Sequence, residues 1–112
     1  MADKELLLLI YCAAGVLLAG LSIPLIRKKV PPNGIYGFRI EKTLNNPELW
    51  YLVNHYSARR MLWTALAFTG TALVLYFIPG ISLDTYAMLC LGVFSIGMVI
   101  AIVQTVNYLR SL

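Results

Sequence analysis

Three long stretches of this sequence contain no charged residue, and they restrict its fold more than any other feature. They cover residues 6–26, 61–83 and 85–109, which are 21, 23 and 25 residues long. Because an α-helix rises about 1.5 Å per residue, about 20 apolar residues cross a hydrocarbon core of about 30 Å. Only 12% of the 112 residues are charged, whereas soluble domains keep about a quarter charged. The sequence therefore predicts an all-α membrane protein, with one membrane domain over residues 1–112.

The second and third stretches predict a helical hairpin. Asp84 alone separates them, and Pro79-Gly80 before it is typical of a turn. A turn over residues 78–85 leaves three predicted transmembrane helices, at 6–26, 61–79 and 86–109. It also predicts an aromatic belt at one membrane interface, formed by Tyr76, Phe77 and Tyr86.

The basic residues predict how the chain is oriented. Seven of the nine lie in residues 27–60, with only Glu41 and Glu48 as acidic residues there. Since cytoplasmic loops of membrane proteins carry the excess of Lys and Arg, we expect a multi-pass protein of the cell membrane with a cytoplasmic 27–60 loop and C-terminus. The N-terminus and the turn near Pro79 are then expected outside.

The cytoplasmic loop carries several local signals. Pro31-Pro32 stops the first helix, and Asn33-Gly34 favours a turn with positive φ. Residues 35–40 alternate as an extended segment does, which predicts a short strand or a re-entrant piece. Asn46-Pro47 is a helix start. A short amphipathic helix is therefore predicted at about 47–60, lying in the membrane interface, with an apolar face of Leu49, Trp50, Val53 and Tyr56.

One set of loop residues resembles a known family. In order and spacing, residues 31–54 are similar to the signature of the SdpI-type immunity membrane proteins, although Ile40-Glu41 stands where that family usually has Thr-Pro. The resemblance implies protection of a producing cell against its own secreted membrane-active toxin, and retention of a transcriptional repressor at the membrane. It rests on Pro32-Asn33, Tyr36-Gly37-Phe38-Arg39, Thr43-Leu44, Trp50 and Asn54.

The resembling residues are the candidate binding site, and each also has a structural interpretation. Arg39 could bind a phosphate, a carboxylate or an acidic patch of a regulator through two charge-assisted hydrogen bonds, or be a solvated basic residue. Trp50 could belong to a binding surface or anchor the helix at headgroup depth. Asn33 and Asn54 could order a folded loop without any ligand. The full candidate set is Asn33, Tyr36, Gly37, Phe38, Arg39, Trp50 and Asn54.

The expected partners are the lipid bilayer and either a toxin peptide or a transcriptional regulator. Three helices form a thin bundle that leaves much polar loop surface unsupported, so a homodimer or a partner subunit is also considered. The small-residue pairs Gly15/Ala19 and Gly97/Ala101 suit close helix contact. Direct binding of nucleic acid is not expected, since the loop is too short for a nucleic-acid-binding domain.

Enzymatic activity is not expected, because no catalytic pair can be assembled. His55 is the only histidine and has no partner at ligand or triad spacing, so no cofactor or metal is expected either. The three spans contain no ionisable acid or base, which argues against proton-coupled transport. The alternative function is a small transporter or channel subunit without proton coupling, acting as an oligomer with a path lined by threonines and Gln104.

Overall fold

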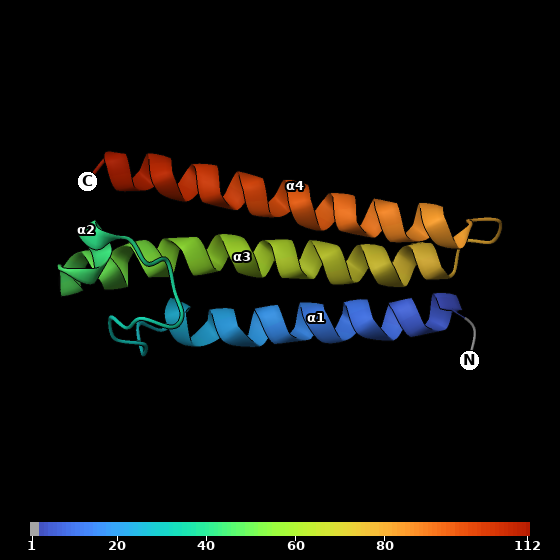
Figure 1. Cartoon of the computed structure of the whole chain (residues 1–112), viewed down its shortest axis with the longest axis horizontal. Coiled ribbons are helices and arrows are strands. Elements are labelled where there is room, and N and C mark those ends of the chain that lie inside the picture. Colours follow the sequence, from blue (N-terminus) through green and yellow to red (C-terminus); the bar gives the residue numbers. More distant parts are fainter. Residues whose placement is uncertain (1–2) are drawn as a thin grey trace.

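The computed structural model describes residues 3–112, which form three long helices and one short one. Helix α1 is Asp3–Ile26, α2 is Glu41–Leu44, α3 is Pro47–Tyr76 and α4 is Leu83–Arg110. The long helices lie side by side, with α3 in the middle, and the loop with α2 lies at one end (Figure 1). No residue in 3–112 belongs to a strand, so the short strand considered for residues 35–40 is wrong.

Helices α1 and α4 are long and apolar enough to cross a membrane. They contain the first and third predicted spans, with α1 beginning three residues earlier and α4 covering the predicted 86–109. The α4 start is explained by Ser82, whose Oγ accepts a hydrogen bond from Thr85 N at 3.2 Å. This side-chain cap begins the helix before the residue that hydrophobicity alone suggested.

Helix α3 is one continuous helix where the sequence predicted two. Asn46 Oδ1 accepts a hydrogen bond from Leu49 N, and Pro47 occupies the first turn, which confirms the predicted helix start. Residues 47–60 are not a separate interfacial helix, because neither Pro nor Gly interrupts the chain before Gly70. The change from polar to apolar residues near Arg60 alters the surroundings of the helix but not its backbone.

An aromatic core joins the three long helices at the end opposite the loop. Tyr11 from α1 packs on Phe68 from α3 and Tyr86 from α4, with ring centroids 5.1 and 6.1 Å apart. Tyr86 is fully buried, and its hydroxyl donates to Ala72 O at 2.9 Å. The predicted aromatic belt is therefore wrong for Tyr86, whereas Phe77 is 76% exposed.

Two glycines allow α3 to lie close to its neighbours. A Cβ added to Gly15 of α1 would lie 1.8 Å from Thr69 Oγ1, and one added to Gly97 of α4 would lie 2.7 Å from Thr64 Cγ2. The small residues singled out from the sequence thus pack helices within one chain. They carry no information about an oligomer.

Candidate functional site

The loop begins where α1 ends in a Schellman motif. Lys29 N donates to Pro24 O at 3.0 Å and Lys28 N donates to Leu25 O at 3.2 Å, which is the bonding pattern of that motif. Lys28 occupies the left-handed position, with φ 59°. The helix therefore stops before Pro31-Pro32.

Asn33 orders the turn that follows. Its Oδ1 accepts hydrogen bonds from Ile35 N at 2.9 Å and Tyr36 N at 2.8 Å, and its Nδ2 donates to Pro31 O at 2.8 Å. The turn role predicted for Asn33 is confirmed. The positive φ predicted for the Asn33-Gly34 turn is wrong, and the glycine of this loop that has a positive φ is Gly37.

Two buried side chains of α3 hold the middle of the loop. Trp50 Nε1 donates to Val30 O at 2.7 Å, and Asn54 Oδ1 accepts from Phe38 N at 2.5 Å. Trp50 is 0% exposed and Asn54 1% exposed. The backbone hydrogen bond predicted for Asn54 is confirmed. Headgroup anchoring by Trp50 is wrong, because its indole is enclosed between the loop and α3.

Gly37 passes directly over these two side chains. A Cβ there would lie 2.9 Å from both Asn54 Oδ1 and the Trp50 ring, and the φ of +119° is one that side chains with a Cβ rarely adopt. Glycine is needed here because both the space and the backbone conformation exclude a side chain.

Thr43 closes the loop from α2. Its Oγ1 accepts a hydrogen bond from Ile40 N at 3.1 Å and donates one to Phe38 O at 2.9 Å. Together, Asn33, Asn54 and Thr43 satisfy loop backbone groups that a strand ladder would otherwise have bonded. This is the physical reason that residues 35–40 do not form a strand.

The two remaining candidate residues face different surroundings. Tyr36 donates its hydroxyl hydrogen to Leu21 O of α1 at 2.7 Å, so it ties the loop to the helix before it. Arg39 donates from Nη1 to Gly34 O at 2.6 Å, and its side chain is otherwise exposed. A recognition role for Arg39 stays a prediction.

His55 is a structural residue to which sequence reasoning gave no role. Its Nδ1 lies 2.6 Å from Ile26 O, the last residue of α1. Because a carbonyl oxygen only accepts hydrogen bonds, Nδ1 is the donor in this pair. The contact sets the level of α1 against α3, so that about two turns of α3 extend past the end of α1 and support the loop.

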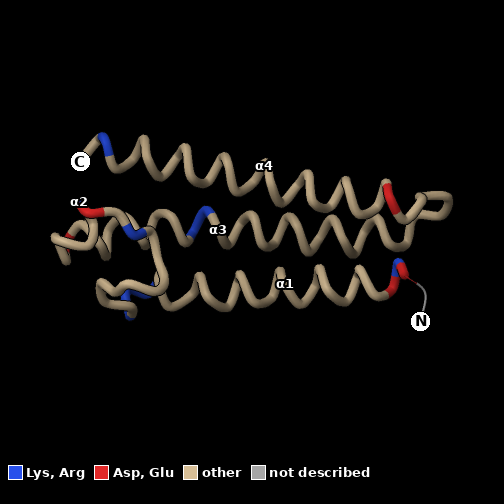
Figure 2. The backbone as a smooth tube through the Cα atoms, in the orientation of Figure 1, with Lys and Arg blue, Asp and Glu red and all other residues tan. Residues whose placement is uncertain are grey.

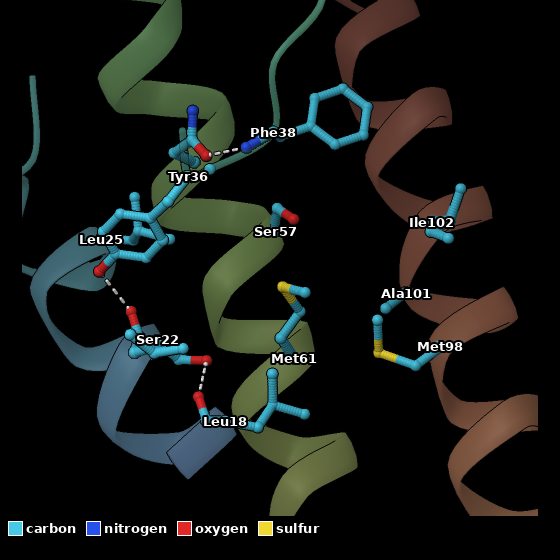
Figure 3. A pocket seen from close by; sticks show the side chains of 13 residues that line it. Leu18, Ser22, Leu25, Tyr36, Phe38, Ser57, Met61, Met98, Ala101 and Ile102 are labelled. Atoms are coloured by element: carbon cyan, nitrogen blue, oxygen red, sulfur yellow. Dashed lines mark hydrogen bonds between the residues drawn. The ribbon is translucent and has the colours of Figure 1, made fainter. Parts of the chain in front are cut away.

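An apolar cavity of about 220 Å³ lies beneath the loop. Helices α1 and α4 meet at the end of the molecule opposite the loop, where Tyr11 contacts Tyr86 and Ala87. Towards the loop, the cavity lies between these two helices, with α3 behind it (Figure 3). Its lining is mainly apolar and includes Leu18, Leu21 and Leu25 of α1, Met61 of α3, and Met98 and Ile102 of α4.

Four of the seven candidate residues form the loop side of this cavity, and Asn33, Arg39 and Trp50 do not line it. Tyr36, Gly37, Phe38 and Asn54 all line it, joined by the hydroxyl groups of Ser22 and Ser57. Ser22 Oγ donates to Leu18 O at 2.8 Å. The cavity is therefore apolar with a few polar atoms near the loop, a composition typical of small ligand sites. In residues 3–112, no three His, Cys, Asp or Glu side chains gather as metal ligands would.

Charge is strongly divided between the two ends of the molecule. Basic residues outnumber Glu41 and Glu48 around the loop and the adjoining helix ends, whereas Asp84, Asp3 and Glu5 lie at the opposite end (Figure 2). Lys4 is the basic residue at that opposite end, where its Nζ donates to Ile81 O at 3.1 Å.

Comparison with known proteins finds one family. A model described as the SdpI/YfhL protein family matches residues 29–106, which include the loop, α2, α3 and most of α4. No curated protein and no solved structure matches the chain.

Proposed function

The chain belongs to the SdpI/YfhL protein family, and from this premise we propose that it is a membrane protein that binds a membrane-active peptide in the cavity beneath its loop. Family membership and the two apolar helices identify a membrane protein. The observation that supports the binding site is that Tyr36, Gly37, Phe38 and Asn54 converge on one cavity.

The size and lining of the cavity suit an apolar side chain. An apolar protein cavity of roughly 150 Å³ can hold a benzene molecule, so about 220 Å³ is enough for one aromatic or branched aliphatic side chain. A peptide that enters the bilayer would insert such a side chain between α1 and α4. The protein would in this way withdraw the peptide from the membrane and prevent damage to it.

The proposal includes three membrane spans. The third is the part of α3 from Met61 onward, which lies between α1 and α4 over most of their length. The charge division in Figure 2 supports a cytoplasmic loop and C-terminus, with the N-terminus and the 77–82 turn outside. Single cysteines at Ile35 and Ser82, in a background without Cys12 and Cys90, test this arrangement. An impermeant maleimide should label position 82 in intact cells and position 35 only after the cells are opened.

A protection assay tests the function. The gene is deleted from its own host, and cells are exposed to conditioned medium of the undeleted strain while a dye reports membrane potential. We expect the deletion strain to depolarise and the wild-type chain to restore resistance. The Ser57→Leu variant fills the cavity, so it should fail to restore resistance. The control is Thr71→Leu on the same helix, which should restore resistance because the Thr71 hydroxyl bonds only to Ala67 O. Equal protection by Ser57→Leu would contradict the cavity as the site.

The second function that we propose from the family resemblance is that the chain holds a transcriptional regulator at the membrane. The exposed Arg39 at the loop surface supports it, because a guanidinium can pair with an acidic patch. Arg39→Gln should then release the regulator from the membrane without changing protection.

The alternative of a channel subunit predicts ion flux in liposomes, and this flux should be absent if the cavity is a binding site.

A further inference from the structure

A groove follows the contact between α3 and α4 and changes character along its length. Its loop end is a polar hollow of about 260 Å³, and an apolar hollow of about 300 Å³ adjoins it. Arg60 and Trp63 line both hollows, so the two are continuous. The polar part is also lined by His55, Tyr56, Arg59 and Tyr108.

The two helices that line the polar part place no carboxylate near Arg59 or Arg60. Glu48 is the only acidic residue of α3 and precedes Arg59 by eleven residues, which is about 16 Å along a helix. Asp84, the only acidic residue of α4, lies at the far end of the molecule (Figure 2). Arginine pairs most strongly with carboxylate or phosphate, and neither helix that lines the hollow places such a group beside Arg59 or Arg60.

Aromatic rings hold one guanidinium at the mouth of the groove. The Arg60 guanidinium lies over the Tyr56 ring at 4.9 Å from its centroid. Tyr56 in turn stacks on Tyr108 of α4, with centroids 4.3 Å apart and an interplanar angle of 9°. This stack spans the two helices, so it fixes the position of Arg60 relative to α4 and reduces the entropy lost when an anion binds.

The apolar part of the groove leads away from the loop, towards the middle of the helices. It is lined by Ala67 of α3 and by Gly97 and Ile100 of α4. Trp63 is 65% exposed where the polar and apolar parts meet. Exposed tryptophans are typical of the membrane interface, at the depth of lipid headgroups.

We propose that this groove binds one anionic phospholipid, with its phosphate on Arg59 and Arg60 and an acyl chain along Ala67 and Gly97. Free phosphate offers the same headgroup chemistry, but the apolar continuation of the groove favours a lipid. The groove is lined by α3 and α4 alone, whereas the cavity beneath the loop is also lined by α1; Ala101 of α4 lines both. It rests on α3 crossing the membrane as proposed above.

Quenching of Trp63 by brominated lipids tests the site directly. The full chain is placed in phosphatidylcholine vesicles that contain a minor fraction of either phosphatidylglycerol or phosphatidylcholine brominated near the glycerol end of its acyl chains. Trp50 is fully buried, and a Trp63→Phe variant measures its residual signal. We expect brominated phosphatidylglycerol to quench Trp63 at much lower mole fraction than brominated phosphatidylcholine does.

Charge-matched variants separate a site from general attraction to a basic protein. Arg59→Gln with Arg60→Gln should lower the preference for phosphatidylglycerol by about 10- to 30-fold, given the usual contribution of a basic residue at an anionic membrane. Lys29→Gln with Lys42→Gln removes the same charge from exposed loop positions and should leave the preference nearly unchanged. Ala67→Leu keeps every charge but fills the apolar part, so it should also weaken the preference.

Four results would overturn the proposal, each for a different reason. Equal loss in both double variants would show general electrostatic attraction only. Displacement of the brominated lipid by glycerol 3-phosphate at constant ionic strength would assign the arginines to a soluble phosphate. Absence of quenching by either lipid would place Trp63 outside the bilayer and would also contradict the third span, whereas equal quenching by both lipids would contradict the lipid site alone.

Discussion

Removing the side chain of Asn54 should open the loop without unfolding the helices. In Asn54→Ala, the partly buried Phe38 N–H loses its acceptor at 2.5 Å. The Trp50 carbonyl, which also accepts from Asn54 Nδ2, keeps its bond within the helix. One orphaned buried N–H costs about 1–3 kcal/mol. The equilibrium constant for opening of the loop should therefore rise by a factor of about 5 to 150, since about 1.4 kcal/mol corresponds to a tenfold change.

Hydrogen exchange measured by mass spectrometry can detect this change. In lipid nanodiscs, peptides from residues 31–46 should exchange faster by that factor in Asn54→Ala, while peptides from α4 keep their wild-type rates. Asn107→Ala is the matched control, because Asn107 is exposed on α4, and it should change neither. Loop exchange within a factor of two of wild type would refute the reasoning that Asn54 holds the loop. Equal acceleration in α4 would show a global effect instead.

Three further substitutions test the backbone features of the fold. Gly37→Ala should raise loop exchange at least as much as Asn54→Ala, since its φ is +119° and its Cβ would meet neighbours at 2.9 Å, whereas Gly34→Ala meets nothing and should match wild type in the same assay. Gly15→Ala should lower the free energy of unfolding in micelles by about 1–3 kcal/mol through overpacking, whereas Gly20→Ala, with no neighbour within 4 Å, should not lower it. Lys28→Gly should raise the same free energy by about 1 kcal/mol, because glycine relieves the left-handed conformation at φ 59°; an unchanged value would show that Lys28 is unstrained.

The sequence predicted local features of the fold better than distant contacts. The cap at Asn46 and the turn at Asn33 depend on residues within three positions, so spacing alone was sufficient. The division of α3 was wrong because a change in hydrophobicity was interpreted as a change in the backbone. A helix continues through such a change unless Pro or Gly interrupts it.

The site itself was only partly predictable. Five of the seven candidate residues lie in one folded loop and the other two, on α3, hold it in place. Trp50 was assigned to the membrane surface because its partner, Val30, is 20 residues away. Likewise, His55 was considered only for metal or catalytic chemistry, and its bond to Ile26 spans 29 residues. The cavity could not be inferred at all, because it depends on how α1 and α4 separate.

Photo-crosslinking from the cavity is the most direct test of the proposed binding site. A photoreactive residue at position 98 of α4 would face the cavity, and the same residue at position 96 would be on the exposed side of the helix, where Ile96 is 64% exposed. In membranes of the native host, we predict a discrete peptide adduct from position 98 that is absent from position 96 and is lost when Ser57→Leu fills the cavity. Lipid adducts alone at both positions, unchanged by Ser57→Leu, would contradict the account.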